Sequence, residues 1–178
     1  MNEHELMTEL QRIGLNAQTF RAVMLLPLIE VAWADQAIQA KERKAILAIA
    51  KGHDLLEGNA ADVVDAWLTR RPSSETFALG RRLLATLAHN KTGLGADVPE
   101  HVSDTVVDLC SIIAESAGGL FGVWFNVSSE EKKTIRLITE HLEAVTDSLA
   151  GPNRGIVGRT ISHSWLGVLE DLGEDSLD

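Results

Sequence analysis

The stretch VAWADQAIQAKERKAI, residues 31–46, contains the pattern on which the predicted fold rests. It ends a run of apolar residues with an acid, Asp35, and a second acid, Glu42, opens another amphipathic run seven residues later. Residues 17–34 are almost wholly apolar, which predicts a central, buried helix. Residues 39–53 carry apolar side chains at helical spacing, so a second helix is expected to pack back on the first as a hairpin.

A second copy of this arrangement lies further along the chain. Residues 102–117 form another oily segment with an acid, Glu115, near its end, and residues 129–149 form a long amphipathic segment. In both copies a Glu follows an Ile or Val by four residues where the second helix starts. These pairs are Ile38 with Glu42 and Val127 with Glu131. The chain is therefore predicted to contain two helix hairpins that pack around a shared core.

The rest of the chain also has helical character, and we find no convincing alternation of period two. Tyr is absent and aromatic residues are few, a composition that favours helices over strands. The 178 residues therefore predict one all-α domain, 1–178, built as a compact bundle of about seven or eight helices. It would contain repeat one at about 17–53, kinked near Pro27, and repeat two at about 102–149. Further helices are expected at 3–13, 62–70, 74–90 and 165–172.

The charge of the chain excludes one broad class of partner. Its 26 acids and 16 bases give a formal net charge of −10, whereas a nucleic-acid-binding protein needs a basic face to neutralise phosphates. The nearest approach to such a face is two arginine pairs, which we interpret as ordinary surface charge: Arg70 with Arg71 and Arg81 with Arg82. The acids concentrate in the tail at about 170–178, which is expected to be a solvated end. We therefore predict no nucleic-acid partner.

Cysteine usage and hydropathy predict where the protein resides. The single cysteine, Cys110, has apolar neighbours and cannot form an internal disulfide, so we expect a core residue in a reducing compartment. The longest apolar run, 22–34, is too short to span a bilayer. The first ten residues, MNEHELMTEL, lack the basic start and apolar core of a signal peptide. These features predict a cytoplasmic protein that does not span a membrane.

Two of the acids have a local structural explanation. In the stretch SSEE, Ser128 at the N-cap and Glu131 at N3 predict a capping box, in which each residue satisfies an N–H group of the other. Glu42 has the same place in its helix, but Gln39 stands at the cap and Gln is not a favoured N-cap. Spacings of four and seven also put each Glu at the inward-facing head of a stripe of isoleucines. Capping alone and a role as ligand both stay open.

Asp35 is harder to explain, because an acid at the C-terminal end of a helix faces the negative end of the helix dipole. It would be tolerated if it capped the next segment, met a base such as Lys41 or Arg43, or bound a cation. Hard cations prefer oxygen ligands, and carboxylates from several helix ends supply them. The candidate metal ligands are Asp35, Glu42, Glu115 and Glu131, with Ca²⁺, Mg²⁺, Mn²⁺ and Zn²⁺ left undistinguished and no organic cofactor expected.

Two other acids leave alternatives open. Glu115 lies on a polar stripe with Asp104, Asp108 and Ser111, and such stripes are usually solvated faces. Glu30 lies inside the oily segment and is expected either to pair with a base or to join the same acidic cluster.

The stretch AWADQAIQAKERKAI resembles the repeat of the TerB-like family of tellurite-resistance proteins, Ala-x-x-Asp-Gly-x-Ile-x-x-x-Glu. The matching residues are Ala32, Asp35, Ile38 and Glu42 in the first copy and Val127 and Glu131 in the second. Gln36 stands where the family has Gly. The similarity covers about 22–53 and, more loosely, about 102–142. It implies an all-helical domain of paired repeats with an acidic cluster, an association with tellurite and other stress resistance, and metal binding or membrane-complex scaffolding without a known enzymatic activity.

We therefore expect a non-enzymatic bacterial stress-response protein, resembling tellurite-resistance proteins, that binds a divalent cation or a protein partner at its acidic helix junctions. The alternative is a protein–protein adaptor that docks its partner on the apolar loop 118–125, the acids being purely structural. In that case Leu120, Phe121 and Trp124 would make the contacts. No nucleophile and base form a recognisable catalytic set in the sequence, so no enzymatic activity is predicted.

Overall fold

The computed structural model describes residues 1–90, 92–99, 101–117 and 127–150, without the side chains of 117 and 145–150. Over these ranges the chain forms seven α-helices and two short 3₁₀ helices, η1 and η2, with no strand, which confirms the predicted all-α bundle. The predicted helix 165–172 lies outside the described residues. The elements are α1 (Glu3–Arg12), η1 (Phe20–Met24), α2 (Leu25–Ala32), α3 (Ala40–Gly52), α4 (Ala60–Thr69), α5 (Ser74–His89), η2 (Gly93–Asp97), α6 (Val102–Ala117) and α7 (Ser129–Ala150).

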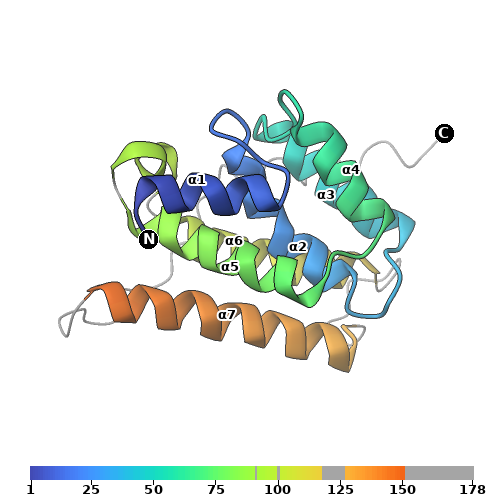
Figure 1. Ribbon diagram of the computed structural model, residues 1–178. Helices are drawn as coiled ribbons and strands as arrows, with labels where there is room; N and C mark the ends of the chain where they lie inside the picture. Colours follow the sequence, from blue (N-terminus) through green and yellow to red (C-terminus); the bar gives the residue numbers. More distant parts are fainter. Residues whose placement is uncertain (91, 100, 118–126, 151–178) are drawn as a thin grey trace.

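Helix α2 is the centre of the bundle. It packs against α3, α4, α5, α6 and α7, and every one of its residues except Glu30 is buried. Figure 1 shows α7 running along one side of the bundle beside α5, with α1 on the opposite side of α5 and α3 and α4 together at one end. Both predicted hairpins form, because α2 contacts α3 and α6 contacts α7. The equivalence of the two as repeats stays a prediction.

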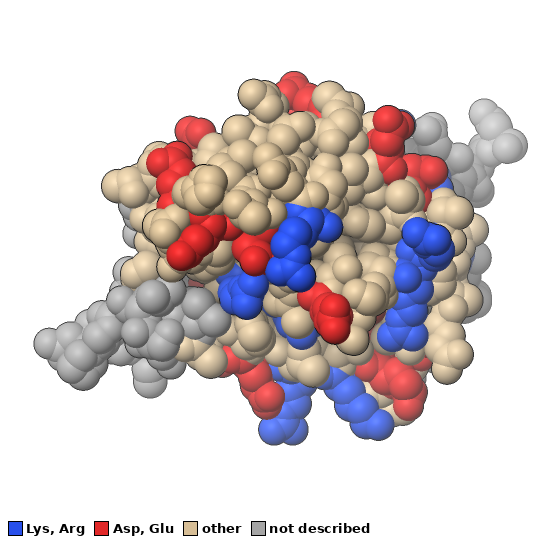
Figure 2. Space-filling model, in the orientation of Figure 1, with Lys and Arg blue, Asp and Glu red and all other residues tan. Residues whose placement is uncertain are grey.

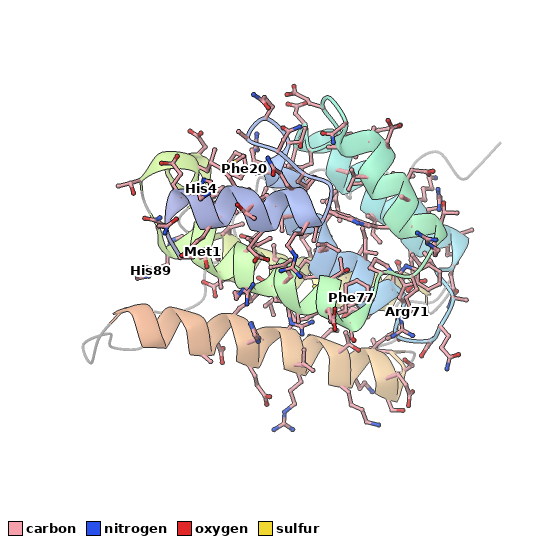
Figure 3. The ribbon with its side chains drawn as sticks, viewed as in Figure 1. Met1, His4, Phe20, Arg71, Phe77 and His89 are labelled. Atoms are coloured by element: carbon pink, nitrogen blue, oxygen red, sulfur yellow. The ribbon has the colours of Figure 1, made fainter. Side chains whose placement is uncertain are left out.

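The prediction of one helix over 17–34 is wrong. A 3₁₀ helix occupies Phe20–Met24, and the α-helix begins only at Leu25. Pro27 explains the division, because its ring clashes with the carbonyl four residues earlier and it has no N–H to donate. At the third position of α2 the missing N–H is one that a helix end leaves unpaired in any case. Phe20 still faces the core from the 3₁₀ helix, as does Phe77 from α5 (Figure 3).

Interpreting Arg81 as surface charge was also wrong. Arg81, in α5, is 8 % exposed and forms an ion pair with Glu30 of α2, so the prediction that Glu30 meets a base is confirmed. Burial nevertheless raises the pKa of Glu30, while Arg81 and Arg71, which is labelled in Figure 3, oppose that rise. Residues 30 and 81 come from different helices, so neither helix pattern by itself indicates the pair. Cys110 is fully buried, as predicted, and burial raises the pKa of its thiol.

Acidic and basic side chains are interspersed over the face seen in Figure 2. Arg82 is exposed, as expected for surface charge, and contacts Glu9 of α1 at 3.5 Å. Among the helices of the described residues, none combines the length and hydropathy needed to cross a bilayer.

Candidate functional site

The connection between α2 and α3 reverses the chain within seven residues, 33–39. Trp33 ends α2 and donates its indole N–H to the carbonyl of Trp67 at 2.9 Å, which ties the connection to the end of α4. Gln36 then donates its backbone N–H to the Trp33 carbonyl at 3.0 Å. Its φ of 69° is in the left-handed region, which non-glycine residues seldom adopt. The turn thus has the backbone that a Gly favours, at the position where the TerB-like pattern has Gly.

Glu42 is buried although it is an acid near a helix end. It is the third residue of α3, and its carboxylate accepts the backbone N–H of Gln39 at 2.6 Å. Its side chain is 2 % exposed, since it heads the stripe that continues with Ile46 and Ile49 into the core. The spacing argument that placed Glu42 on the inward face is therefore confirmed.

Glu131 repeats this arrangement at the start of α7. Its carboxylate accepts the backbone N–H of Ser128 at 2.7 Å, and the Ser128 hydroxyl accepts the backbone N–H of Glu131 at 3.1 Å. The predicted capping box is therefore confirmed. Glu131 is 3 % exposed, so both N-terminal glutamates are desolvated. By contrast Glu5 makes the same kind of capping contact with Asn2 in α1 but is exposed.

Ser128 also joins the two hairpins. Its hydroxyl donates to a carboxylate oxygen of Asp35 at 2.9 Å across 93 residues of sequence. Capping uses the oxygen of that hydroxyl as an acceptor, so its proton is left for Asp35. We call the set Asp35, Glu42, Glu131 and Ser128 the acidic junction.

The carboxylates of the acidic junction affect one another electrostatically. The pKa of Glu42 is raised from its ordinary value of 4.5 to about 7, mainly by burial and further by the charges of Glu131 and Asp35. The hydrogen bond from the Gln39 N–H opposes this rise. Among the described residues no Lys or Arg forms an ion pair with any of the three acids. Arg43, one expected partner of Asp35, instead contacts Asp65 of α4 at 2.6 Å.

The other predicted site residues are not brought into this set. Glu115 is exposed near the end of α6, and no hydrogen bond joins it to the acidic junction among the described residues, so its role as a ligand stays a prediction. Leu120, Phe121 and Trp124 lie outside the described residues. In the described part of the chain, no group of three or more His, Cys, Asp or Glu side chains is arranged so that it could hold a metal ion.

The bond between Ser128 and Asp35 is the contact that sequence reasoning missed. The sequence identified Ser128 as a cap and Asp35 as an acid lacking a local partner, but it gave no signal that the two meet. Comparisons with protein-family models, with curated proteins and with solved structures found no match. The likeness to the TerB-like family therefore rests on the residues of the motif.

Proposed function

We propose that the acidic junction binds a divalent cation, in a non-enzymatic protein of the stress-response kind that the TerB-like motif implies. The observation that carries the proposal is the convergence of Asp35, Glu42 and Glu131 from two hairpins without a basic partner among the described residues. Glu42 and Glu131 are buried, whereas Asp35 is exposed. Burying carboxylates that lack a counter-charge is costly, so buried acids usually bind a proton, a base or a metal. Here Glu42 can take a proton near neutral pH.

The ligand chemistry favours a hard cation. The junction offers carboxylate and hydroxyl oxygens, which Ca²⁺, Mg²⁺ and Mn²⁺ prefer, and it offers no thiolate or imidazole. One oxygen of each carboxylate is used in the hydrogen bonds described above, Oδ1 of Asp35 and Oε2 of both glutamates. The second oxygen of each makes no hydrogen bond to a described residue. Because the acids do not already form a set of metal ligands, we expect binding to draw them together around the ion and its waters.

Thermal unfolding with added metal tests the proposal. A ligand at about one hundred times its dissociation constant stabilises the folded state by about 2.7 kcal/mol, which raises the melting temperature by several degrees. We expect Ca²⁺, Mg²⁺ or Mn²⁺ to produce such a rise in the native chain after prior treatment with a chelator. The rise should be lost in the variant Asp35→Asn/Glu42→Gln and kept in Glu5→Gln, which changes an exposed glutamate with the same capping contact.

Two results would overturn the proposal. One is the absence of any shift with every metal. The other is an equal shift in the native chain and in the Asp35→Asn/Glu42→Gln variant, since the ion would then bind somewhere else. Because these substitutions remove charge but keep side-chain size, the metal-free variant should fold, and its melting curve without metal checks this directly.

A further inference from the structure

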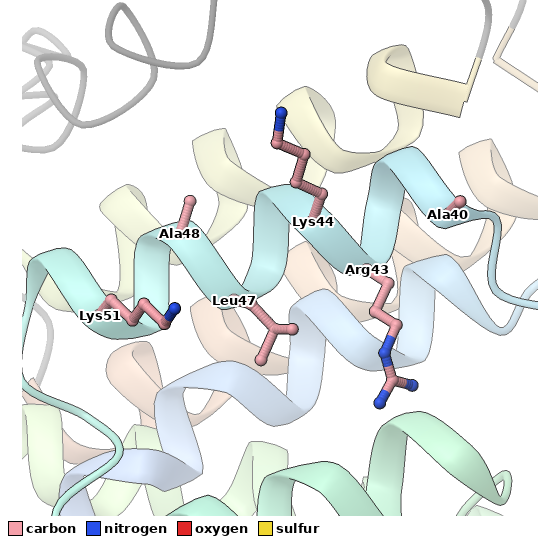
Figure 4. A pocket seen from close by; sticks show the side chains of 6 residues that line it. All are labelled: Ala40, Arg43, Lys44, Leu47, Ala48 and Lys51. Carbon is pink, nitrogen blue, oxygen red and sulfur yellow. The ribbon is translucent and has the colours of Figure 1, made fainter. Parts of the chain in front are cut away.

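Helix α3 presents an uncovered face opposite its buried one. Glu42, Ile46 and Ile49 belong to the buried face, which packs against α2 and α6. The opposite side of the helix lines a groove of about 510 Å³, and the six residues of this groove are all exposed or half-buried: Ala40, Arg43, Lys44, Leu47, Ala48 and Lys51. In Figure 4, Lys44 and Ala48 project to one side of this face and Arg43 and Leu47 to the other.

The groove is both basic and apolar. Lys44 and Lys51 are seven residues apart, which is about two helical turns or about 10.5 Å, so they lie in line along α3. Leu47 and Ala48 lie between them, one on each side of that line. Neither lysine forms an ion pair with a described residue, and no described acid lines the groove. A surface that fits the groove therefore has two acids at the same spacing and an apolar side chain between them.

The outer face of α6 has this arrangement. Asp108 and Glu115 are also seven residues apart, and Ile112 lies between them. Asp108 and Ile112 are half-buried and Glu115 is exposed, whereas Leu109 and Ile113 are buried in the core. Neither acid forms an ion pair with a described residue. We call Asp108, Ile112 and Glu115 the α6 stripe.

The groove and the α6 stripe match in charge and in apolar contact at the same time. When α6 of one copy lies along α3 of another, the two acids fall opposite Lys44 and Lys51, because both pairs have the same spacing. Ile112 then falls opposite Leu47 if the two helices are parallel and opposite Ala48 if they are antiparallel, within about 1.5 Å along the axis. The acids and the isoleucine share one face of α6, so all three contacts can form together.

The two surfaces cannot meet within one chain. Helices α3 and α6 already pack on each other through their buried sides, which turns the groove and the α6 stripe outward. Every copy carries both surfaces, so two copies related by a twofold axis can form the contact twice. We propose that the chain forms a homodimer in which the α3 groove of each protomer receives the α6 stripe of the other. No residue of the acidic junction belongs to either surface, so the dimer does not depend on the proposed cation.

Reciprocal charge reversal tests the dimer by sedimentation velocity on the full-length protein, with a chelator present. The native chain should dimerise at high protein concentration and dissociate with added salt, which screens exposed ion pairs. Lys44→Glu/Lys51→Glu and Asp108→Lys/Glu115→Lys should each raise the dimer dissociation constant at least about a hundredfold, since each turns all the proposed ion pairs into repulsive ones. An equal mixture of the two variants should form a heterodimer, because both of its contacts again join opposite charges.

The matched control reverses the same number of charges elsewhere. Lys132→Glu/Lys133→Glu changes two exposed lysines of α7 and should dimerise as the native chain does. Melting curves check that each variant is folded. A second measurement needs no variant: in a mixture of isotope-labelled and unlabelled native chains, carbodiimide should join Lys44 or Lys51 of one chain to an acid of the α6 stripe of the other.

Four results would overturn the proposal. The first is a native chain that stays monomeric at every attainable concentration. The second is a dimer whose dissociation constant neither reversal changes, since the copies would then meet through other surfaces. The third is the absence of a heterodimer in a mixture of the two folded variants, because the reversed charges would then not be partners. The fourth is a set of cross-links that never joins a labelled chain to an unlabelled one.

Discussion

Replacing Glu42 by Gln should make the protein more stable above neutral pH and hardly change it in mild acid. The pKa of this carboxyl is raised from 4.5 to about 7 in the folded protein. Between these two pH values the folded chain binds more protons than the unfolded chain, so the free energy of unfolding falls as pH rises. At about 1.4 kcal/mol per pH unit the raised pKa corresponds to a cost of roughly 3 kcal/mol, fully present above pH 7.

Gln removes that cost because it cannot ionise, while its carbonyl can still accept the Gln39 N–H. It also loses a favourable charge at the start of α3, worth about 0.3–1 kcal/mol. We therefore expect Glu42→Gln to gain about 2–3 kcal/mol in the free energy of unfolding at about pH 8, less than about 1 kcal/mol at about pH 5, and close to zero at about pH 4.

Urea unfolding across this pH range, with a chelator present, measures the effect. The matched control is Glu5→Gln, which removes the same helix-end charge from an exposed site and should lower stability slightly at both pH values. The reasoning is refuted if the difference between the native chain and Glu42→Gln does not change with pH. It is equally refuted if Glu42→Gln and Glu5→Gln have the same effect near pH 8.

Three further predictions concern the packing of the bundle and can be checked by urea unfolding at neutral pH. Gln36→Gly should stabilise the protein by up to about 1 kcal/mol, because φ of 69° costs Gln more than it costs Gly; a loss of stability would contradict this. Gly80→Ala should cost about 1–3 kcal/mol in spite of better helix propensity, since its Cβ would lie 2.6 Å from Cδ1 of the buried Leu26. Arg81→Met should cost about 3–5 kcal/mol by leaving Glu30 without its partner, and the further change Glu30→Gln should restore much of that loss.

The sequence predicted those parts of the fold that depend on neighbouring residues. The bounds of α6 and α7 and the capping box of Ser128 and Glu131 follow from periodicity and cap chemistry, which act over a few residues. Dividing 17–34 into a 3₁₀ and an α-helix was not predicted, although Pro27 was recognised as a point of irregularity. Proline is compatible both with a kink inside one helix and with the first turn of a new helix, and tertiary packing decides which of the two forms.

The candidate site was only partly predictable for a related reason. Helical spacing placed Glu42 and Glu131 on inward faces, and both are buried. Nothing in either hairpin indicated that the Ser128 hydroxyl would reach Asp35, because that contact depends on how the two hairpins pack. The pair formed by Glu30 and Arg81 is a similar case, since it depends on the packing of α2 against α5.

The central position of α2 has a consequence for the order in which the bundle opens. Its eight residues contact five other helices, so the amides of Ile29 and Val31 become accessible only when the bundle as a whole comes apart. Helices α1 and α4 pack mainly on one neighbour each and can detach by themselves. Amide hydrogen exchange should therefore be slowest in α2, where it reports global unfolding, and faster in α1 and α4, where it reports local opening. Because α2 ends three residues before Asp35, this slowest-exchanging helix leads directly into the acidic junction.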